Sequence, residues 1–250
     1  MLKGKKILVT SGGTSEYIDD VRIMTNISTG KLGALIANHL ASKDAEVHYL
    51  HGRNACTPNA APVTIGVHGL SKGRRGLSIA NMRQNDHIWD REVRSAQDAY
   101  NAMEELVPQM DAVIHCMAVS DFTFKRDDAV KCSSSDPEAF IEYMRKTITK
   151  NPKIIGKIKQ WNPKTVLIGF KFEVGLGLGE LIILADKSIT GNGCDLVVAN
   201  DKAEMTREQE HVAHFVYSEA MQQAVGAGDF EVRGKDEIAK EIAKFLSEVL

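Results

Sequence analysis

Short apolar runs alternate with stretches of helical periodicity along most of the chain. The runs that we predict as strands are "KILVT" (6–10), "EVHYL" (46–50), "AVIHCMAV" (112–119), "TVLIGFKF" (165–172) and "DLVVAN" (195–200). The stretches between them repeat apolar residues with the spacing of an amphipathic helix, as do Leu32, Leu35, Ile36 and Leu40. Near-continuous apolar strands separated by helices indicate a mostly parallel sheet that is covered on both faces.

The C-terminal part follows a different pattern. Two runs, "EHVAHFVYS" (210–218) and "FEVRG" (230–234), are separated by the turn-rich "VGAGD", which is typical of an antiparallel hairpin at a sheet edge. The final helix has a single apolar face made of Ile238, Ile242, Phe245 and Val249. We therefore predict one domain over residues 1–250. Its fold is a Rossmann-like, doubly wound α/β sheet with helices on both faces and this hairpin near the C-terminus.

One stretch, residues 66–94, follows neither the helix nor the strand pattern. It carries six Lys or Arg residues against three Asp or Glu residues. A solvated surface insertion and a mobile basic flap over an anionic ligand both fit this composition. We interpret Trp89 within it as a local packing anchor.

The composition is that of a soluble globular protein, with 43% hydrophobic and 26% charged residues in a chain of 250. A formal net charge of -2 gives no general attraction for nucleic acid or an anionic membrane. The four cysteines form no C-x-x-C pair. We find no signal peptide and no apolar run of about 18 residues, the length of a membrane span. We expect a cytoplasmic protein that binds neither nucleic acid nor a membrane.

The segment "TSGGTSEYIDDVR" (10–22) occupies the first strand-to-helix connection, where open α/β sheets commonly bind phosphate. It does not match G-x-G-x-x-G, and the second strand ends in "YLHGRN", without the acid that binds a dinucleotide's ribose. Gly30 and Lys31 fit a P-loop, but Thr25 stands where its first glycine belongs and Leu32 where its hydroxyl belongs. Both NAD binding and Walker-type hydrolysis are therefore disfavoured.

Two glycine and hydroxyl clusters remain in this connection, "SGGTS" (11–15) and "NISTG" (26–30). Backbone N–H groups of a glycine turn can converge on an anion because no Cβ blocks the approach. The candidate contacts in the two clusters are Gly12, Gly13, Thr14, Ser28 and Gly30. We expect a helix to begin near Gly30, so Ser28 and Thr29 serve either as N-caps or as ligand contacts. Two anion sites in one connection fit a polyphosphate or two phosphorylated substrates.

The longer stretch "GGTSEYIDDVRIMTNISTGKLG" resembles the signature of phosphopantothenate-cysteine ligase, also called phosphopantothenoylcysteine synthetase. Four later segments resemble motifs of that family in the same order. They are "MAVSDF" (117–122, like A-V-(A/S)-D-(F/W/Y)), "NPKIIGKIK" (151–159, like N-P-D-I-x-x-x-(I/L)), "IGFKFEV" (168–174, like G-F-x-x-E) and "CDLVVAND" (194–201, like D-x-(I/V)-(V/A)-A-N-D). Each motif alone is weak, but their shared order makes the match specific.

This resemblance implies an activity in coenzyme A biosynthesis. In the family's reaction, the carboxylate of 4'-phosphopantothenate attacks a nucleoside triphosphate, usually CTP in bacteria, and yields an acyl-nucleotide and pyrophosphate. The amine of L-cysteine then attacks the activated carbonyl and releases the nucleoside monophosphate. Such chemistry requires positioning and charge neutralisation more than a covalent nucleophile. The sequence leaves the choice between CTP and ATP open.

The resemblance also implies Mg²⁺ as a cofactor and a homodimer. The later part of the sheet would contribute to the dimer interface, for which the 210–234 hairpin is suited. Family members often carry an N-terminal flavin domain, whereas this chain begins at the first strand of the ligase motif and resembles the stand-alone bacterial branch. We therefore expect no flavin and no decarboxylase activity.

The resemblance assigns individual site residues. Asn26 matches the family asparagine that contacts the acyl-nucleotide and helps its conversion, although an asparagine in a turn would give the same pattern. Asp121 matches the acid near the nucleotide, where it would bind ribose or position Mg²⁺; alternatively it caps a helix or turn. Ser120, Phe122 and Phe170 are assigned to the nucleotide site, while a buried aromatic residue is by default part of the core.

The lysine that neutralises phosphate charge is assigned to Lys131. Many family members carry K-x-K-K after the A-V-(A/S)-D motif, whereas this chain has "KRDDAVKCSSS" (125–135). Ser133 and Ser134 are candidates for hydroxyl contacts, and Lys125 is the alternative lysine.

Two functions from other classes compete with the ligase. A regulatory module could bind a nucleotide without turnover, but binding alone needs neither Asn26 nor Lys131. A short-chain NAD(P)-dependent reductase needs a Tyr-x-x-x-Lys pair, and none of the five tyrosines has lysine at that spacing.

Overall fold

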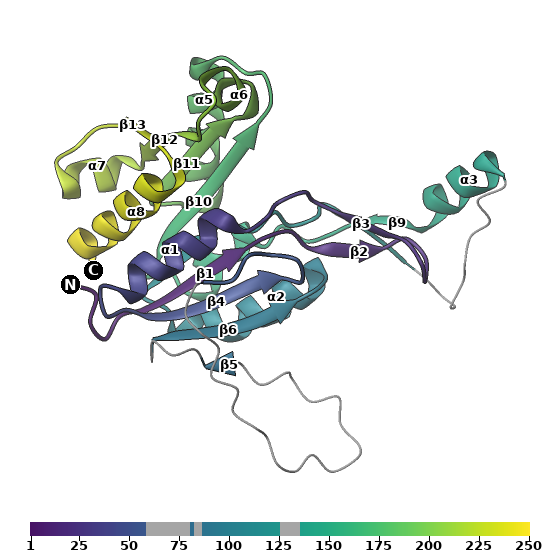
Figure 1. Cartoon of the computed structure of the whole chain (residues 1–250), viewed down its shortest axis with the longest axis horizontal. Coiled ribbons are helices and arrows are strands. Elements are labelled where there is room, and N and C mark those ends of the chain that lie inside the picture. The colour runs from purple at the N-terminus through teal and green to yellow at the C-terminus, as the bar shows by residue number, and fades with distance from the viewer. Residues whose placement is uncertain (59–80, 83–86, 126–135) are drawn as a thin grey trace, which may run out of the picture.

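The computed structural model describes residues 1–58, 81–82, 87–125 and 136–250. Within these residues, nine strands form one sheet in the order β13-β12-β11-β10-β7-β1-β4-β6-β5 (Figure 1). The strands are β1 (Lys6–Ser11), β4 (Glu46–Gly52), β5 (Asn81–Met82), β6 (Ile88–Val93), β7 (Ala112–His115), β10 (Val166–Glu173), β11 (Leu196–Asp201), β12 (Val212–Tyr217) and β13 (Phe230–Arg233). Each pair of neighbours from β6 to β11 is parallel, so the predicted Rossmann-like, mostly parallel sheet is confirmed.

The direction in which the sheet grows reverses between β1 and β7. From β1 the chain builds outward through β4 and β6, and it then returns to β7 and builds the other way through β10 and β11. In such sheets the loops that leave the two central strands diverge, and ligands bind outside their carboxyl ends. The loops after β1 and β7 therefore lie at the expected position of a site.

Helices cover both faces of the sheet, as predicted. One face packs against α1 (Lys31–Ala41) and α8 (Lys235–Val249), and the other against α2 (Ala96–Leu106), α4 (Ile155–Trp161) and α5 (Leu178–Asn192). A short 3-10 turn, η1 (Val107–Gln109), follows α2. No helix in the described part of the chain is both long enough and apolar enough to span a membrane.

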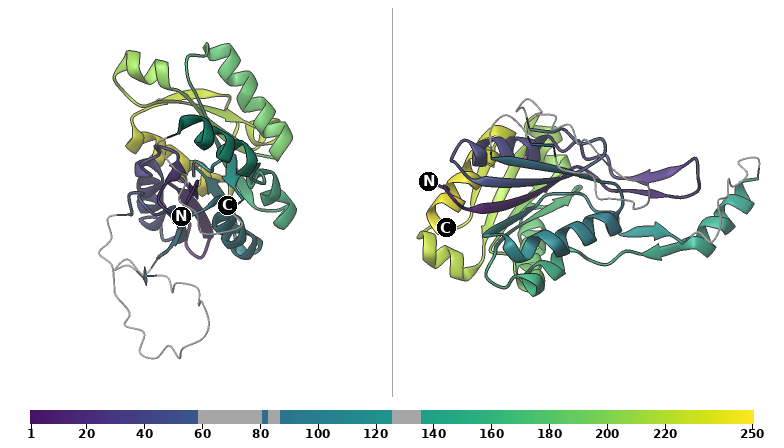
Figure 2. Two further views of the ribbon diagram at one scale, coloured as in Figure 1. Left: turned by 90° about the vertical axis from the view of Figure 1, so that its right-hand side faces the viewer. Right: turned by 90° about the horizontal axis from the view of Figure 1, so that it is seen from below.

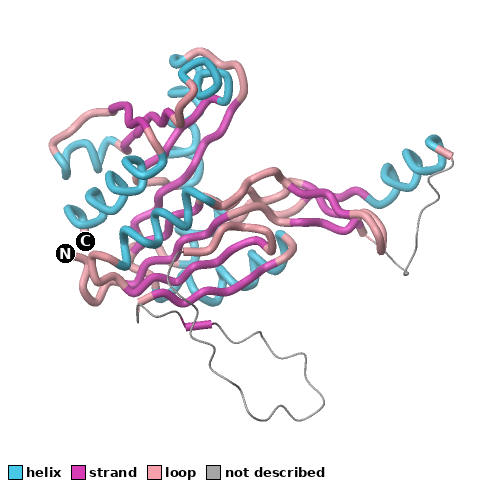
Figure 3. The backbone as a smooth tube through the Cα atoms, viewed as in Figure 1, coloured by secondary structure: helices cyan, strands magenta, loops and turns pink. Residues whose placement is uncertain are grey.

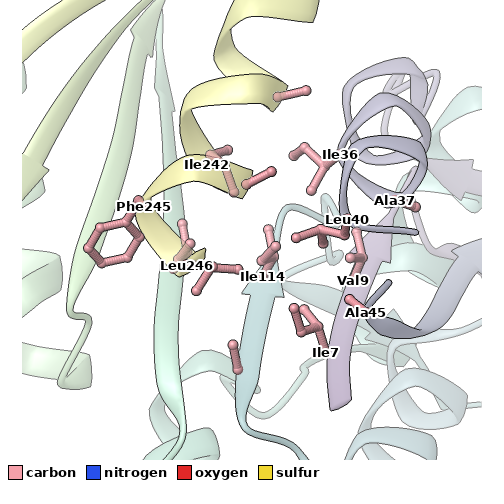
Figure 4. Close-up of a cluster of buried hydrophobic side chains, with 14 of the residues drawn as sticks. Ile7, Val9, Ile36, Ala37, Leu40, Ala45, Ile114, Ile242, Phe245 and Leu246 are labelled. Atoms are coloured by element: carbon pink, nitrogen blue, oxygen red, sulfur yellow. The ribbon is translucent and has the colours of Figure 1, made fainter. Parts of the chain in front are cut away.

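Strand alternation decides which core each side chain joins. Ile7 and Val9 of β1 belong to the core beneath α1 and α8, whereas Leu8 between them belongs to the core on the other face. In Figure 4, side chains of β1 and β7 meet those of α1 and α8, including the fully buried Leu40 and Ile242. Nearly continuous apolar strands are thus explained by burial on two faces.

An arm extends beyond the carboxyl ends of the parallel strands (Figures 1 to 3). It consists of the strands β2 (Ser15–Tyr17), β3 (Ile23–Thr25), β8 (Phe122–Phe124) and β9 (Ile148–Lys150) and the helix α3 (Pro137–Thr147). β2 pairs with β3 and β8 pairs with β9, both antiparallel. The connection between β1 and α1, which we expected to be a loop, therefore contains a hairpin, and both chain termini lie at the end opposite the arm (Figures 1 and 2).

Polar contacts hold the arm together and join it to the start of α2. The Glu16 carboxylate is only 3% exposed. It accepts hydrogen bonds from the Ala96 N–H at the start of α2 and from the Thr123 hydroxyl of β8, both at 2.7 Å. The Tyr143 hydroxyl of α3 donates to the Ile18 carbonyl at 2.8 Å. These bonds give β2, β8 and α3 fixed positions relative to α2.

The C-terminal strands β12 and β13 pair antiparallel at the edge of the sheet, as predicted. The connection between them contains α7 (Glu219–Val225), which the sequence pattern did not predict. The Ser218 side chain caps its first turn, and Gly226 ends it with a φ of 67°. The helix α6 (Lys202–Glu208) follows β11 and is capped by the Asp201 carboxylate.

Most of the stretch 66–94 lies outside the described residues. Its last part, however, forms β6, which pairs with β4. The pattern did not predict this strand because charged residues interrupt its apolar positions. One of these, Asp90, is buried with His51 of β4, and an oxygen of its carboxylate lies 3.6 Å from His51 Nε2. The Trp89 ring stacks on His48 with 6.3 Å between centroids.

Leu40→Ala should lower the free energy of unfolding by about 2–5 kcal/mol, because Leu40 is fully buried and the truncation leaves a cavity. Urea unfolding measures the change. Leu178→Ala is the matched control, since Leu178 is 55% exposed and its truncation should have a much smaller effect. Equal losses in the two variants would contradict the described core.

Candidate functional site

A glycine turn leaves β1 at the reversal point of the sheet. Gly12 has a φ of 75°, a conformation that L side chains rarely adopt, and a Cβ there would lie 2.5 Å from the Ala55 Cβ. A Cβ on Gly13 would lie 2.8 Å from the Asn26 carbonyl oxygen, and one on Gly52 would collide with the Gly13 carbonyl oxygen. Glycine is thus required because three backbone segments meet at this point.

The turn is also bonded to the loop that follows β7. The Ala118 N–H donates to the Gly12 carbonyl at 2.8 Å, and the Thr14 N–H donates to the Ala118 carbonyl at 3.2 Å. The Thr14 hydroxyl oxygen accepts from the Ser120 N–H at 2.8 Å. These three bonds join the predicted residues Gly12, Thr14 and Ser120 in one structure.

Asn26, which directly follows β3, contacts the same loop. Its side-chain amide donates to the Ala118 carbonyl at 2.9 Å, while the residue remains exposed. The Thr25 hydroxyl donates to the Thr14 carbonyl at 2.9 Å, which lays this segment along the glycine turn. An amide has two N–H donors and one oxygen acceptor, so Asn26 keeps hydrogen-bonding capacity beyond the bond to Ala118.

The second cluster lies at the start of α1. Gly30 is the N-cap, with a φ of 70° and without a side-chain cap, so the expectation that Ser28 or Thr29 caps the helix is wrong. The Ser11 hydroxyl donates to the Gly30 carbonyl at 3.0 Å. Because no side chain caps the first turn of α1, its N–H groups lack an intrahelical partner. They lie at the positive end of the helix dipole, where anions are favoured.

Ser120 and Asp121 differ in their surroundings. Ser120 is buried, its hydroxyl donates to the Phe122 carbonyl at 2.8 Å, and its carbonyl accepts from the Asn151 side chain at 2.9 Å. The Asp121 carboxylate is 55% exposed and contacts the ammonium of Lys153 at 2.6 Å. Sequence reasoning missed Lys153, which stands where the family pattern N-P-D-I has aspartate.

The two aromatic candidates also differ. Phe122 is 47% exposed at the base of the arm. Phe170 is half-buried on β10, the neighbour of β7, and packs against the core beneath α1 and α8. Phe170 therefore has the contacts of a core residue as well as its assignment to the nucleotide site.

The lysine candidates are described only in part. Lys131, Ser133 and Ser134 lie outside the described residues. Lys125 is exposed after β8, and its backbone N–H donates to the Thr147 carbonyl at 2.8 Å.

Two buried side chains support the loop after β7 from below, and neither was predicted. The Thr10 hydroxyl oxygen accepts from the Met117 N–H at 3.2 Å and lies 2.9 Å from His115 Nδ1. Burial lowers the pKa of His115 to about 4 and raises the pKa of the Cys116 thiol to about 12. Both are neutral near pH 7, so the thiol is a poor nucleophile there.

Comparisons with known proteins agree with this geometry. Residues 2–72 and 76–250 match the family model described as the DNA/pantothenate metabolism flavoprotein C-terminal domain. The coenzyme A biosynthesis bifunctional protein CoaBC of Thermococcus kodakarensis is 33% identical over 213 residues, which cover 84% of this chain and 45% of that protein. The chain thus spans less than half the length of this relative.

Two solved structures share the fold over nearly the whole chain. The crystal structure of the DNA/pantothenate metabolism flavoprotein from Streptococcus pneumoniae is 32% identical with a TM-score of 0.73, and the match covers 99% of this chain and 100% of that one. The C-terminal domain of a CoaBC protein is 25% identical with a TM-score of 0.68, covering 99% and 96% of the two chains.

The burial of His115 should make stability depend on pH. Because its pKa is lower in the folded than in the unfolded protein, the unfolded chain binds more protons between about pH 6.5 and pH 4, and the free energy of unfolding falls as the pH is lowered through this range. His115→Asn, which keeps a hydrogen-bonding side chain beside Thr10, should remove a contribution on the order of 2–3 kcal/mol across that range.

Urea unfolding at a series of pH values measures this slope. His211, whose pKa burial also lowers to about 4, remains in the variant. Part of the slope should therefore persist. A variant with the full slope of the unaltered protein would contradict the role given to His115.

Proposed function

Because the chain belongs to the family of the DNA/pantothenate metabolism flavoprotein C-terminal domain, we propose that it ligates 4'-phosphopantothenate to L-cysteine. The observation that carries the proposal is the set of hydrogen bonds among Thr14, Asn26 and the loop 118–121 around the glycine turn. Two of the motifs that resemble the ligase family thus meet at the carboxyl ends of β1 and β7, where α/β folds bind ligands.

The proposed reaction has two steps. A carboxylate oxygen of 4'-phosphopantothenate attacks the α-phosphorus of the nucleoside triphosphate, and pyrophosphate leaves with the bonding electron pair. The cysteine amine then attacks the acyl carbonyl, the amide bond forms, the amine loses a proton, and the nucleoside monophosphate leaves. We propose CTP as the nucleotide, with ATP as the alternative, and the cytoplasm as the location.

Each part of the site has a task in these steps. The glycine turn and the start of α1 offer backbone N–H groups to phosphate oxygens. Asn26, held by its bond to Ala118, presents amide groups to the carbonyl oxygen that becomes negatively charged. The buried His115 and the half-buried Cys116 remain neutral, and their contacts with Thr10 help to keep the supporting loop in place.

A divalent cation fits beside this loop. Mg²⁺ is usually bound through one or two carboxylates together with substrate phosphates, and Asp121 supplies one exposed carboxylate. Mg²⁺ bound there would neutralise phosphate charge.

Pyrophosphate release tests the ligase. Purified protein with Mg²⁺, 4'-phosphopantothenate and L-cysteine should release pyrophosphate when CTP or ATP is added separately. No release with either nucleotide would falsify the proposal, and nucleotide binding without release would favour the regulatory module instead.

Asn26→Ala should bind the nucleotide but turn over about 10²–10³-fold more slowly, because one donor to the developing negative charge is lost. An acyl-nucleotide should accumulate, which mass spectrometry of quenched reactions detects. Asn101→Ala is the matched control, since Asn101 lies exposed on α2. Unchanged turnover in Asn26→Ala would remove Asn26 from the mechanism.

We also propose a homodimer. Exposed apolar side chains on the arm and the adjoining segment support it; they are Val21, Ile23, Ile27, Phe122, Ile141 and Ile148. Contiguous apolar patches mark interaction sites in soluble proteins, and we propose that these side chains form such a patch. The 210–234 hairpin, where we expected an interface, offers less, because β12 lies inside the sheet.

Light scattering coupled to size exclusion tests the dimer. Ile148→Asp should shift the protein toward the monomer, because a charge would be desolvated in the interface. Ile183→Asp on α5 is the control, since Ile183 is also exposed but lies away from the arm. A monomer before any substitution, or a dimer that Ile148→Asp leaves intact, would contradict the arm as the interface.

A further inference from the structure

We propose that Lys153 binds the phosphates of the nucleotide and that it exchanges Asp121 for them when the nucleotide binds. In this structure the Lys153 ammonium lies 2.6 Å from an Asp121 carboxylate oxygen. The inference rests on the proposed function, and it adds a phosphate-binding residue to the same site.

The backbone next to Lys153 is fixed to the site. Asn151 is only 8% exposed. Its N–H donates to the Asp121 carbonyl at 2.8 Å, and its side chain donates to the Ser120 carbonyl at 2.9 Å. Ser120 is in turn bonded to Thr14. A short series of hydrogen bonds therefore joins the segment that carries Lys153 to the glycine turn.

The side chain of Lys153, by contrast, is free to change partner. The Lys153 and Asp121 side chains are 67% and 55% exposed, and exposed pairs of this kind contribute only about 0–1 kcal/mol. A polyphosphate carries more negative charge than one carboxylate and binds an ammonium through several oxygens. It should therefore displace Asp121 at small cost.

A second ion pair in the same region, between Lys159 and Asp195, differs from the Lys153–Asp121 pair because packing fixes it in place. Lys159 and Asp195 are 25% and 17% exposed, with 2.7 Å between their charged groups. Lys159 also donates to the Thr165 carbonyl, and Asp195 accepts from the Leu167 N–H. That pair is part of the packing between α4 and the sheet, whereas the Lys153 pair has one contact and faces solvent beside the site.

If Lys153 exchanges partners, substitutions of Lys153 and Asp121 should change the affinity for the triphosphate in opposite directions. Without divalent cations, Lys153→Ala should weaken the binding of CTP or ATP about tenfold and affect the monophosphate much less. Asp121→Asn should tighten triphosphate binding, because it removes the competitor for Lys153. In the double variant Asp121→Asn/Lys153→Ala this gain should disappear.

Titration calorimetry in EDTA with tri- and monophosphates, starting from the unaltered full chain, measures these affinities. Lys157→Ala is the matched control, since Lys157 lies half-buried on α4 and its ammonium donates to the Gln160 side chain at 3.1 Å; this variant should bind like the unaltered protein. Lys153→Arg should retain most of the affinity. Melting temperatures should not change, because the pair is exposed.

Two results would overturn the inference. Unchanged triphosphate binding in Lys153→Ala would remove its phosphate contact. Equal weakening of tri- and monophosphate binding in both single variants would show that Lys153 only positions Asp121. If the unaltered protein releases pyrophosphate but Lys153→Ala binds normally, the inference alone fails. If the unaltered protein neither binds a nucleotide nor releases pyrophosphate, both the proposed function and this inference fail.

Discussion

The site depends on the close approach of two backbone segments, the glycine turn after β1 and the loop after β7. Adjacent parallel strands hold their carboxyl ends a fixed distance apart, and the loops that leave them here are joined by the reciprocal hydrogen bonds between Ala118 and the turn. On its other sides the turn packs against the segments at Asn26 and Ala55, and this close packing is possible only because Gly12, Gly13 and Gly52 lack a Cβ. Were the turn to open, Thr14 and Asn26 would lose their shared partner in the β7 loop.

The arm is an extension of the same two loops. β2 and β3 follow the glycine turn, and β8 follows the β7 loop, so the two connections that form the site also form the arm. The buried carboxylate of Glu16 ties both halves of the arm to the start of α2. A partner that bound the apolar side chains of the arm would thus contact a structure that is continuous with the candidate site.

Charge is distributed in the site in a way that suits positioning chemistry. The groups beneath the loop, the buried His115 and the half-buried Cys116, are neutral near pH 7 because desolvation disfavours their charged forms. The charged groups, Asp121 and Lys153, lie at the surface where they can change partners. No described residue at this loop therefore has the character of an activated nucleophile, and a reaction between bound substrates fits it better than covalent catalysis.

The sequence by itself determined the parallel sheet, the helices on both faces and the C-terminal strand pair, because burial on two faces leaves long apolar runs and a strict helical period. It also pointed to the glycine turn, and a resemblance to a family pointed to Asn26 and Asp121.

The sequence did not predict β6, whose buried Asp90 is matched by His51 on another strand. Nor did it predict the arm, whose three-residue strands are too short to show a period. Only the tertiary structure decided that Gly30 caps α1 and that Lys153 meets Asp121, 32 residues earlier in the chain. Such contacts depend on how loops from different strands approach one another, and local sequence pattern carries no record of that distance.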